Sequence, residues 1–223
     1  MSRNFLTTYR PLCGTAFGRR SIALHALPPF VDGSCRREPD LQHEWPSISA
    51  LCRAGSFAPR LREGDKVAYM TKKGFYGQRT PHWRLTALLQ VIHRFESHQE
   101  AAHWYLEKST GLPRNCMVPR NPPLPLDHTD FELDRNLKSR MKALSPAAAI
   151  RLWDAAYRQR AELYPVLLAC KPLFVEVWEP PAIQEQDWQR WYGSQPGTRN
   201  PPVIQDAVWN KLVEQSRRRI NGG

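Results

Sequence analysis

The protein is a chain of 223 residues in which 32 lysines and arginines oppose 21 aspartates and glutamates, giving a formal net charge of +11. A hydrophobic fraction of 41% with eight tryptophans supports a packed core, and the absence of any run of about 18 apolar residues predicts no transmembrane helix. Early arginines interrupt any signal peptide, and five irregularly spaced cysteines fit reduced thiols, so we expect a cytoplasmic protein without a membrane partner.

The positive charge favours a polyanionic partner. Nucleic acid, an anionic membrane surface and an acidic protein all fit this charge, and a merely soluble basic protein is the alternative. We put nucleic acid or a nucleotide first.

The N-terminal part of the chain predicts short elements separated by prolines. Residues 5–10 form a predicted strand, ended by Pro11, and residues 21–27 are a second apolar segment that Pro28-Pro29 halts. Residues 45–53 are predicted as a short helix with Pro46 in its first turn.

The clearest pattern lies in the centre of the chain. Gly64-Asp65 is a turn pair that begins an apolar run at residues 66–71. Residues 83–95 carry apolar side chains at nearly every odd position and mixed side chains at the even ones, as in a strand with one face on the core. We predict that these two strands pair in a strongly bent, mostly antiparallel sheet.

The C-terminal half alternates predicted helices with loops and strands. Ser97 and Glu100 have capping-box spacing at the start of a helix that runs to about residue 108. The remaining predictions are a Pro-rich surface loop at 114–128, a charged helix-compatible segment at 130–144, a helix at 147–163, strands at 166–170 and 173–178, a Trp-rich segment at 187–192 and a helix at 203–220.

The central segment resembles the GD-V-Y…W core of small β-barrels in the PUA-like group, which includes the EVE, ASCH and YTH domains. Residues 28–38 and 56–60 also resemble the nucleotide modification associated domains found with phage and bacterial DNA-modification genes. The resemblance implies an α+β fold, either a small PUA-like β-barrel or a bent, mostly antiparallel sheet, with flanking helices and a helical C-terminal part. It further implies a domain over residues 1–178 with a helical insertion at about 97–163, and a C-terminal helical extension at 179–223.

The loop between the two central strands interleaves basic and aromatic side chains. Aromatic faces stack on bases and cations contact phosphates, so this loop is a candidate nucleotide site. By the resemblance, aromatic walls hold a base, and the candidate nucleotide-binding residues here are Tyr69, Thr71, Lys72, Lys73, Tyr76, Arg79 and Trp83. The alternative is that Tyr69 and Trp83 are core aromatics and that the loop is a solvated hairpin.

Two further basic segments are candidate phosphate contacts. Asp32, Ser34, Arg36 and Arg37 lie in a polar turn that could bind an anion through the arginine pair, and a salt-bridged surface loop is the alternative. Near the C-terminus, Arg217, Arg218 and Arg219 either contact phosphate or complement the end of a helix.

Metal and catalytic sites receive less support. Cys35, His43 and Cys52 lack zinc-site spacing, although the arginines beside Cys35 could lower its pKa. The carboxylates near His128 fit the solvated start of a helix, so we expect no metal and no cofactor. The preferred function is binding of nucleic acid, DNA rather than RNA, at a modified base in DNA modification or phage defence. The alternatives are an enzyme acting on nucleotides or nucleic acid, by base hypermodification or nuclease chemistry, and an adaptor for acidic proteins.

Overall fold

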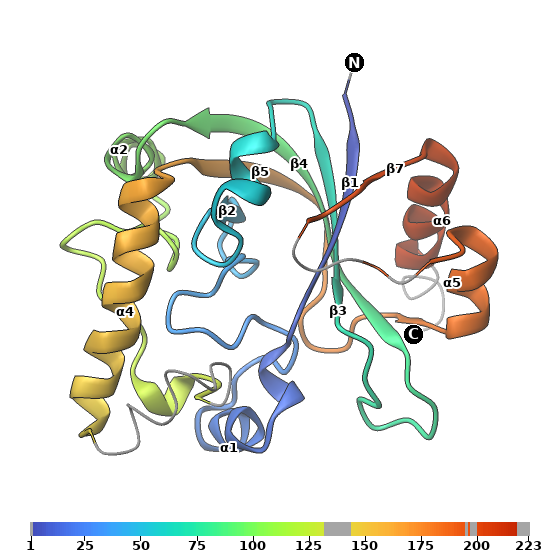
Figure 1. Ribbon diagram of the computed structural model, residues 1–223, viewed down its shortest axis with the longest axis horizontal. Coiled ribbons are helices and arrows are strands. Elements are labelled where there is room, and N and C mark those ends of the chain that lie inside the picture. Colours follow the sequence, from blue (N-terminus) through green and yellow to red (C-terminus); the bar gives the residue numbers. More distant parts are fainter. Residues whose placement is uncertain (1, 132–143, 195, 197–199, 218–223) are drawn as a thin grey trace.

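The computed structural model describes residues 2–131, 144–194, 196 and 200–217, and its centre is a seven-stranded mixed sheet (Figure 1). The strand order is β2 (Ser47–Ser49), β5 (Leu167–Val175), β4 (Trp83–Phe95), β3 (Lys66–Thr71), β1 (Asn4–Tyr9) and β7 (Val203–Ile204), with β6 (Ala182–Ile183) paired to one end of β4. The α-helices in the described ranges are α1 (Ala16–His25), α2 (His98–Glu107), α4 (Pro146–Leu163), α5 (Glu185–Trp191) and α6 (Asp206–Arg217). The connections in the same ranges contain the 3₁₀ turns η1 (Leu12–Gly14), η2 (Ala54–Ser56), η3 (Ala58–Arg60) and η4 (Leu126–His128).

Both predicted central strands are confirmed, and each begins and ends at the predicted residues. β3 and β4 are antiparallel, with Lys66 opposite Gln90, whereas β1 runs parallel to β3. β4 changes partner along its length, from β6 at Trp83 to β5 from Ala87 onward, and register shifts accompany its bend. The α+β class is therefore confirmed. The sheet is open between β2 and β7, so among the described strands it does not close into the barrel that the resemblance implied.

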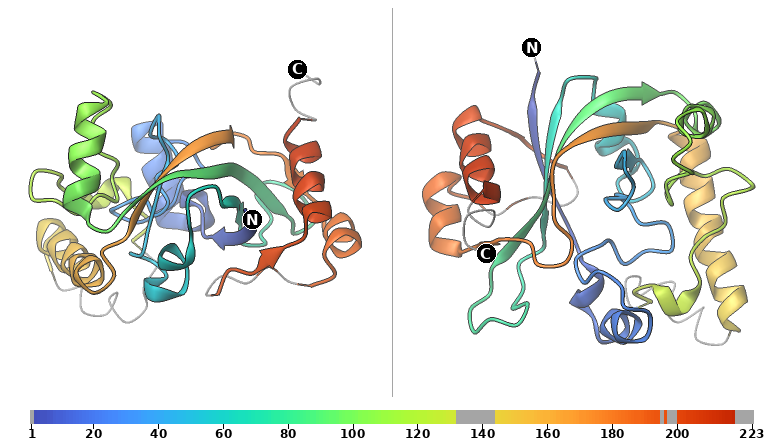
Figure 2. Two further views of the ribbon diagram at one scale, coloured as in Figure 1. Left: turned by 90° about the horizontal axis from the view of Figure 1, so that it is seen from above. Right: turned by 180° about the vertical axis from the view of Figure 1, so that it is seen from behind.

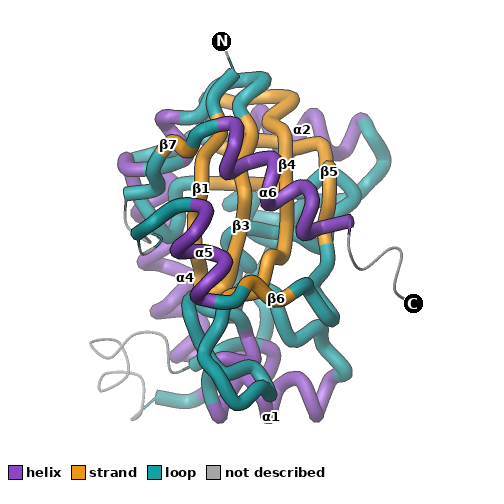
Figure 3. The backbone as a smooth tube through the Cα atoms, turned by 90° about the vertical axis from the view of Figure 1, so that its right-hand side faces the viewer, coloured by secondary structure: helices purple, strands orange, loops and turns teal. Residues whose placement is uncertain are grey.

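Alternation along β1 and β3, together with a register shift in β4 between Leu85 and Ala87, divides the apolar side chains between two faces of the sheet. Phe5, Val67 and Leu89 face a core that is completed by irregular chain between residues 30 and 61. Leu6, Met70 and Leu85 face the opposite side, which α5 and α6 cover with Trp188, Trp209 and Leu212 (Figures 1 and 3). Helices α2 and α4 lie beyond the first face, as the views from above and behind show (Figure 2). No helix in the described part of the chain is both long enough and apolar enough to span a bilayer.

Several predicted elements are confirmed because their end signals are local. Ser97 Oγ accepts a hydrogen bond from Glu100 N at 3.1 Å and caps α2, and Ser145 Oγ accepts one from Ala148 N at 3.3 Å at the start of α4. The apolar segment at 21–27 is the end of α1, and the Trp-rich segment contains α5. The predicted 203–220 helix begins three residues late, because Val203–Ile204 first pairs with β1. The segment 130–144 lies almost wholly outside the described residues.

Three predictions are wrong, and each fails because a distant partner decides the local structure. Residues 45–53 hold strand β2 in place of a helix, since Ser47–Ser49 pairs with β5. The two strands predicted at 166–178 are one, because the register skips Leu173 and thereby accommodates Pro172 at a bulge. The Pro-rich segment 114–128 is not a plain surface loop, because Asn115 and Cys116 are fully buried.

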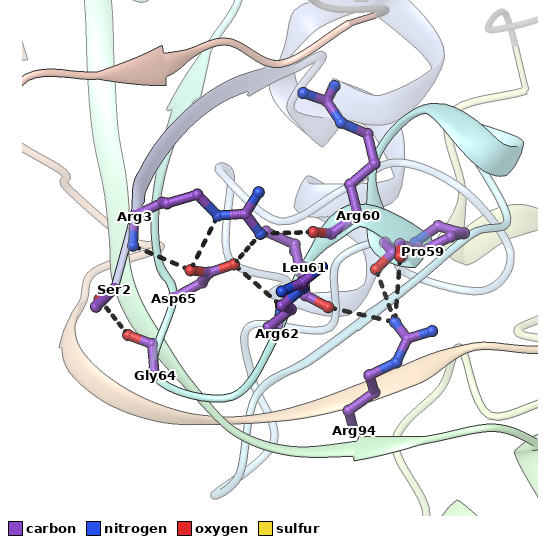
Figure 4. Close-up of polar contacts among 10 residues, drawn as sticks. Ser2, Arg3, Pro59, Arg60, Leu61, Arg62, Gly64, Asp65 and Arg94 are labelled. Atoms are coloured by element: carbon purple, nitrogen blue, oxygen red, sulfur yellow. Dashed lines mark hydrogen bonds and ion pairs between the residues drawn. The ribbon is translucent and has the colours of Figure 1, made fainter.

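The Gly64-Asp65 turn is fixed by a small polar cluster (Figure 4). Gly64 has a φ of +86°, a conformation that glycine adopts without strain. The Asp65 carboxylate accepts hydrogen bonds from Arg3 N at 3.0 Å, Arg3 Nη2 at 2.7 Å and Arg62 N at 3.0 Å. Burial alone would raise the pKa of Asp65, but these hydrogen bonds and the Arg3 charge lower it. The ionised carboxylate therefore holds the starts of β1 and β3 together.

Candidate functional site

The loop between β3 and β4 is an ordered hairpin that projects beyond the sheet (Figure 1). Gly74 and His82 exchange two backbone hydrogen bonds, with N···O distances of 3.0 and 2.9 Å, so the base of the loop continues the strand pair. Gln78 N donates to Phe75 O at 2.8 Å and closes the tip. Tyr76 adopts a positive φ of 41°, and its hydroxyl donates to the carbonyl of Lys72. These contacts give the Tyr76 ring a fixed position.

One side of this hairpin forms a cation-lined pocket of about 720 Å³. The hairpin contributes Lys72, Lys73 and the ring of Phe75, which is 60% exposed. Arg10, at the end of β1, and Arg19, from α1, line the other wall. Four cationic side chains from three segments therefore converge on one concave surface, which suits a polyanion.

A second pocket of about 520 Å³ adjoins the first and shares two of its residues, Phe30 and Tyr76. The two rings meet edge to face with centroids 5.6 Å apart. Trp178, which is 54% exposed, and Arg84 complete the lining with Glu179, Pro180 and Pro181. Arg84 Nη1 donates to Pro180 O at 2.9 Å, and its guanidinium lies 5.7 Å from the Phe30 ring centroid. We call the two pockets together the Tyr76 groove.

The predicted loop residues divide between this groove and the core. Lys72, Lys73 and Tyr76 line the groove, and Arg79 is exposed at the tip of the hairpin. Lys73 also pairs with Glu185 at 2.5 Å and lies over the Trp83 ring. Burial raises the pKa of Tyr76 to about 12, so its hydroxyl stays protonated at neutral pH.

Tyr69, Thr71 and Trp83 are not on an open surface. Tyr69 is fully buried in the core between the sheet and residues 30–61. Trp83 is 1% exposed and packs against Trp188 on the opposite face of the sheet. Thr71 Oγ1 accepts a hydrogen bond from Arg84 N at 2.9 Å. Their expected role as aromatic walls and polar contacts for a base is corrected here, because no ring face of Tyr69 or Trp83 is open to a ligand. Strand alternation places both in the core, as the alternative interpretation held.

The polar segment 32–38 is buried and its charged groups contact the protein itself. Arg36 is 0% exposed and donates from Nε to Asp154 Oδ1 at 2.5 Å and from Nη1 to Asn121 O at 2.7 Å. Arg37 donates to the carbonyls of Asp32, Ser34 and His128. Burial raises the pKa of Asp32, although Ser34 N and Glu38 N donate to its carboxylate. The segment is therefore not a surface loop, and in this conformation neither arginine presents its guanidinium to an external phosphate.

The thiols do not gather into the metal or nucleophilic sites considered from the sequence. Burial raises the pKa of Cys35, opposite to the lowering expected from its neighbouring arginines. His43 instead contacts the carbonyls of Trp45 and Thr110. In the described ranges, the side chains with metal-ligand spacing are His25, Asp127 and His128. Of the C-terminal arginines, Arg217 is exposed at the end of α6, and Arg218 and Arg219 lie outside the described residues.

The predicted site residues did not include Arg10, Arg19, Phe30 and Trp178, which also line the groove. Each lies far along the chain from the hairpin, so no local spacing connects them with it. A signal existed for two of them, because Phe30 and Trp178 are large aromatics within two residues of proline pairs, which disfavour regular structure.

We compared the chain with protein-family models, with curated proteins and with solved structures, and none of the three comparisons gave a match.

Proposed function

We propose that this protein binds nucleic acid in the Tyr76 groove, with an unpaired base in the second pocket, which Trp178 lines, and the adjacent phosphates in the cation-lined pocket. The observation that carries the proposal is the shared wall: Phe30 and Tyr76 separate a basic pocket from an aromatic one. Phosphates and bases alternate along a single strand, so one strand can engage both adjoining pockets at once.

The chemistry of each pocket supports this assignment. Lysine and arginine side chains neutralise phosphates without regard to sequence, whereas an exposed tryptophan offers a flat face on which a base can stack. A base must leave a duplex to reach a concave pocket, which favours single-stranded or locally opened nucleic acid. The net charge of +11 adds long-range attraction for the polyanion. The sequence resemblance to PUA-like and nucleotide modification associated domains supports DNA with a modified base as the preferred ligand.

The test is affinity for a panel of single-stranded and duplex oligonucleotides, unmodified and modified, measured by fluorescence anisotropy at several salt concentrations. Trp178→Ala and Tyr76→Ala should each weaken binding by about 5- to 160-fold, since one base–aromatic stack contributes roughly 1–3 kcal/mol. Tyr164→Ala is the matched control, because Tyr164 is 37% exposed at the end of α4 and lines neither pocket. Thermal unfolding of each variant separates lost affinity from lost structure.

Wild-type affinity in both groove variants, with unchanged melting, would remove the groove as the binding site. Equal affinity for single strands and duplexes would contradict the unpaired base. Mass spectrometry of the oligonucleotides after incubation tests the alternative of an enzyme, which predicts a covalent change in the nucleic acid.

A further inference from the structure

Two histidines and an aspartate meet on the surface between α1 and η4. His25 is the last residue of α1, and Asp127 and His128 lie in η4. His25 Nε2 lies 2.8 Å from Asp127 Oδ2, and His128 Nδ1 lies 3.0 Å from Asp127 Oδ1. The two imidazole rings are stacked, with centroids 3.7 Å apart, and one ligand atom from each residue lies within 4.8 Å of the others.

We propose that His25, Asp127 and His128 bind a divalent transition metal ion, with zinc as the best match. Two imidazole nitrogens and one carboxylate oxygen are ligand types that zinc uses, at distances of roughly 2.0–2.2 Å. The hydrogen bonds from the rings to Asp127 join the nitrogen and oxygen atoms that would instead bind the ion, so binding requires the two rings to rotate out of their stacked arrangement until these atoms surround it. The side chains are 24%, 52% and 28% exposed, and water can therefore occupy a fourth position.

The backbone that carries the three ligands is fixed by contacts independent of them. Ser21 Oγ of α1 donates to Thr129 O at 3.1 Å, and Thr15 Oγ1 donates to Asp130 Oδ1 at 2.6 Å. Arg37 Nη2 donates to His128 O at 2.7 Å. The first two bonds join α1 to the residues that directly follow η4, and the third fixes the backbone of His128, so the backbone of the site is held in place without the ion.

The position of His25 adds an electrostatic contribution. The C-terminal end of a helix carries partial negative charge, which favours a cation beside the last turn of α1. The competing interpretation is a metal-free cluster in which Asp127 accepts hydrogen bonds from both rings. The proposed metal site requires that the protein bind zinc, whereas the metal-free cluster does not.

Equilibrium dialysis of the full chain against Zn²⁺, with the cysteines kept reduced, should show one tightly bound equivalent that Asp127→Asn and His128→Gln both abolish or weaken. The loss should exceed the roughly 10- to 100-fold that removal of an outer-shell partner causes, because a direct ligand is lost. His103→Gln is the matched control, since His103 Nε2 lies 3.2 Å from the Glu107 carboxylate, and it should bind zinc as wild type does. Zinc should also raise the melting temperature of wild type and not of Asp127→Asn.

Thiols are the other source of zinc binding, and Co²⁺ separates them from this site. Cobalt at His25, Asp127 and His128 should show visible d–d absorption without the ultraviolet charge-transfer band of a thiolate ligand. Circular dichroism checks that each variant is folded, and His25→Gln replaces any variant that is not. Absence of a tight equivalent in wild type, retention of it in the folded ligand variants, or a thiolate band that accounts for it would each overturn the proposal.

Discussion

Replacing Arg36 by methionine, Asp154 by leucine, and then both together tests whether this buried ion pair is a structural element. Arg36 is fully buried and the side chain of Asp154 is 8% exposed, so removal of either partner leaves a charge in the interior. Breaking a buried pair by removing one partner costs about 3–5 kcal/mol.

The neighbouring contacts predict that the two single substitutions lower the free energy of unfolding by different amounts. Without Arg36, Asp154 keeps Arg158, which lies 2.9 Å away and is half exposed, so Arg36→Met should cost about 3 kcal/mol. Without Asp154, the guanidinium keeps no carboxylate, only the carbonyls of Asn121 and Arg114, so Asp154→Leu should cost about 5 kcal/mol. The double variant loses both charges. Its remaining cost is about 1–3 kcal/mol, because the Asn121 carbonyl loses its guanidinium donor.

Urea unfolding with linear extrapolation measures these free energies, provided that all four proteins share one m-value. A double variant that loses as much as the two single variants together would refute the reasoning, because it would show no coupling between the two side chains. The same proteins test the phosphate role expected of Arg36. We expect folded Arg36→Met to bind oligonucleotides as wild type does, and a selective loss of affinity in it would contradict the burial argument.

Three further changes have defined outcomes. Trp83→Ala should lose about 3–5 kcal/mol of unfolding free energy, because it leaves a cavity beside Trp188, and its affinity per folded molecule should be unchanged; weaker binding at wild-type stability would contradict its place in the core. Burial raises the pKa of Glu38 from 4.5 to about 7, so the folded state holds a proton that the unfolded state has lost, and wild-type stability should fall as pH rises through this window. Glu38→Gln should lack this fall when urea midpoints at about pH 5 and about pH 7.5 are compared, and an unchanged slope would contradict the assignment. Joint replacement of Arg217, Arg218 and Arg219 by alanine should weaken binding to all sequences alike and reduce the salt dependence by about one unit per phosphate contact, whereas a changed base preference would contradict a phosphate role.

The sequence predicted those parts of the fold whose signals are local. Alternation along Trp83–Phe95 and the turn at Gly64-Asp65 predicted the central strands, and the Ser97 cap predicted the start of α2. Pairing between distant segments has no local signal. The parallel pairing of β1 with β3 and the antiparallel pairing of β2 with β5 therefore could not be read from residue patterns.

The candidate site shows the same division. Lys72, Lys73 and Tyr76 were predicted because they lie together in one loop, whereas Trp178 reaches the groove only through the path of β5. The periodicity that predicted the strand also bears on Tyr69, which shares a face with Val67 and is therefore buried. In the 32–38 segment, dense polarity suggested a surface. Two partners of Arg36 lie at least 85 residues away along the chain: inside the protein, the Asp154 carboxylate neutralises its guanidinium and the Asn121 carbonyl accepts a hydrogen bond from it.

The position of β1 between β3 and β7 has a consequence for the order in which the protein can fold during synthesis. Asn4 Nδ2 donates to Asp206 Oδ1 at 2.6 Å across 202 positions, so a ribosome delivers this neighbour of β1 long after β1 itself. At roughly 5–20 residues per second, β1 waits on the order of 10–40 s for this neighbour. During that interval its free edge, and the face of Leu6 and Ala68 that α6 later covers, remain open to other chains. Nascent chains of this protein are therefore expected to need protection from aggregation until α6 has left the ribosome.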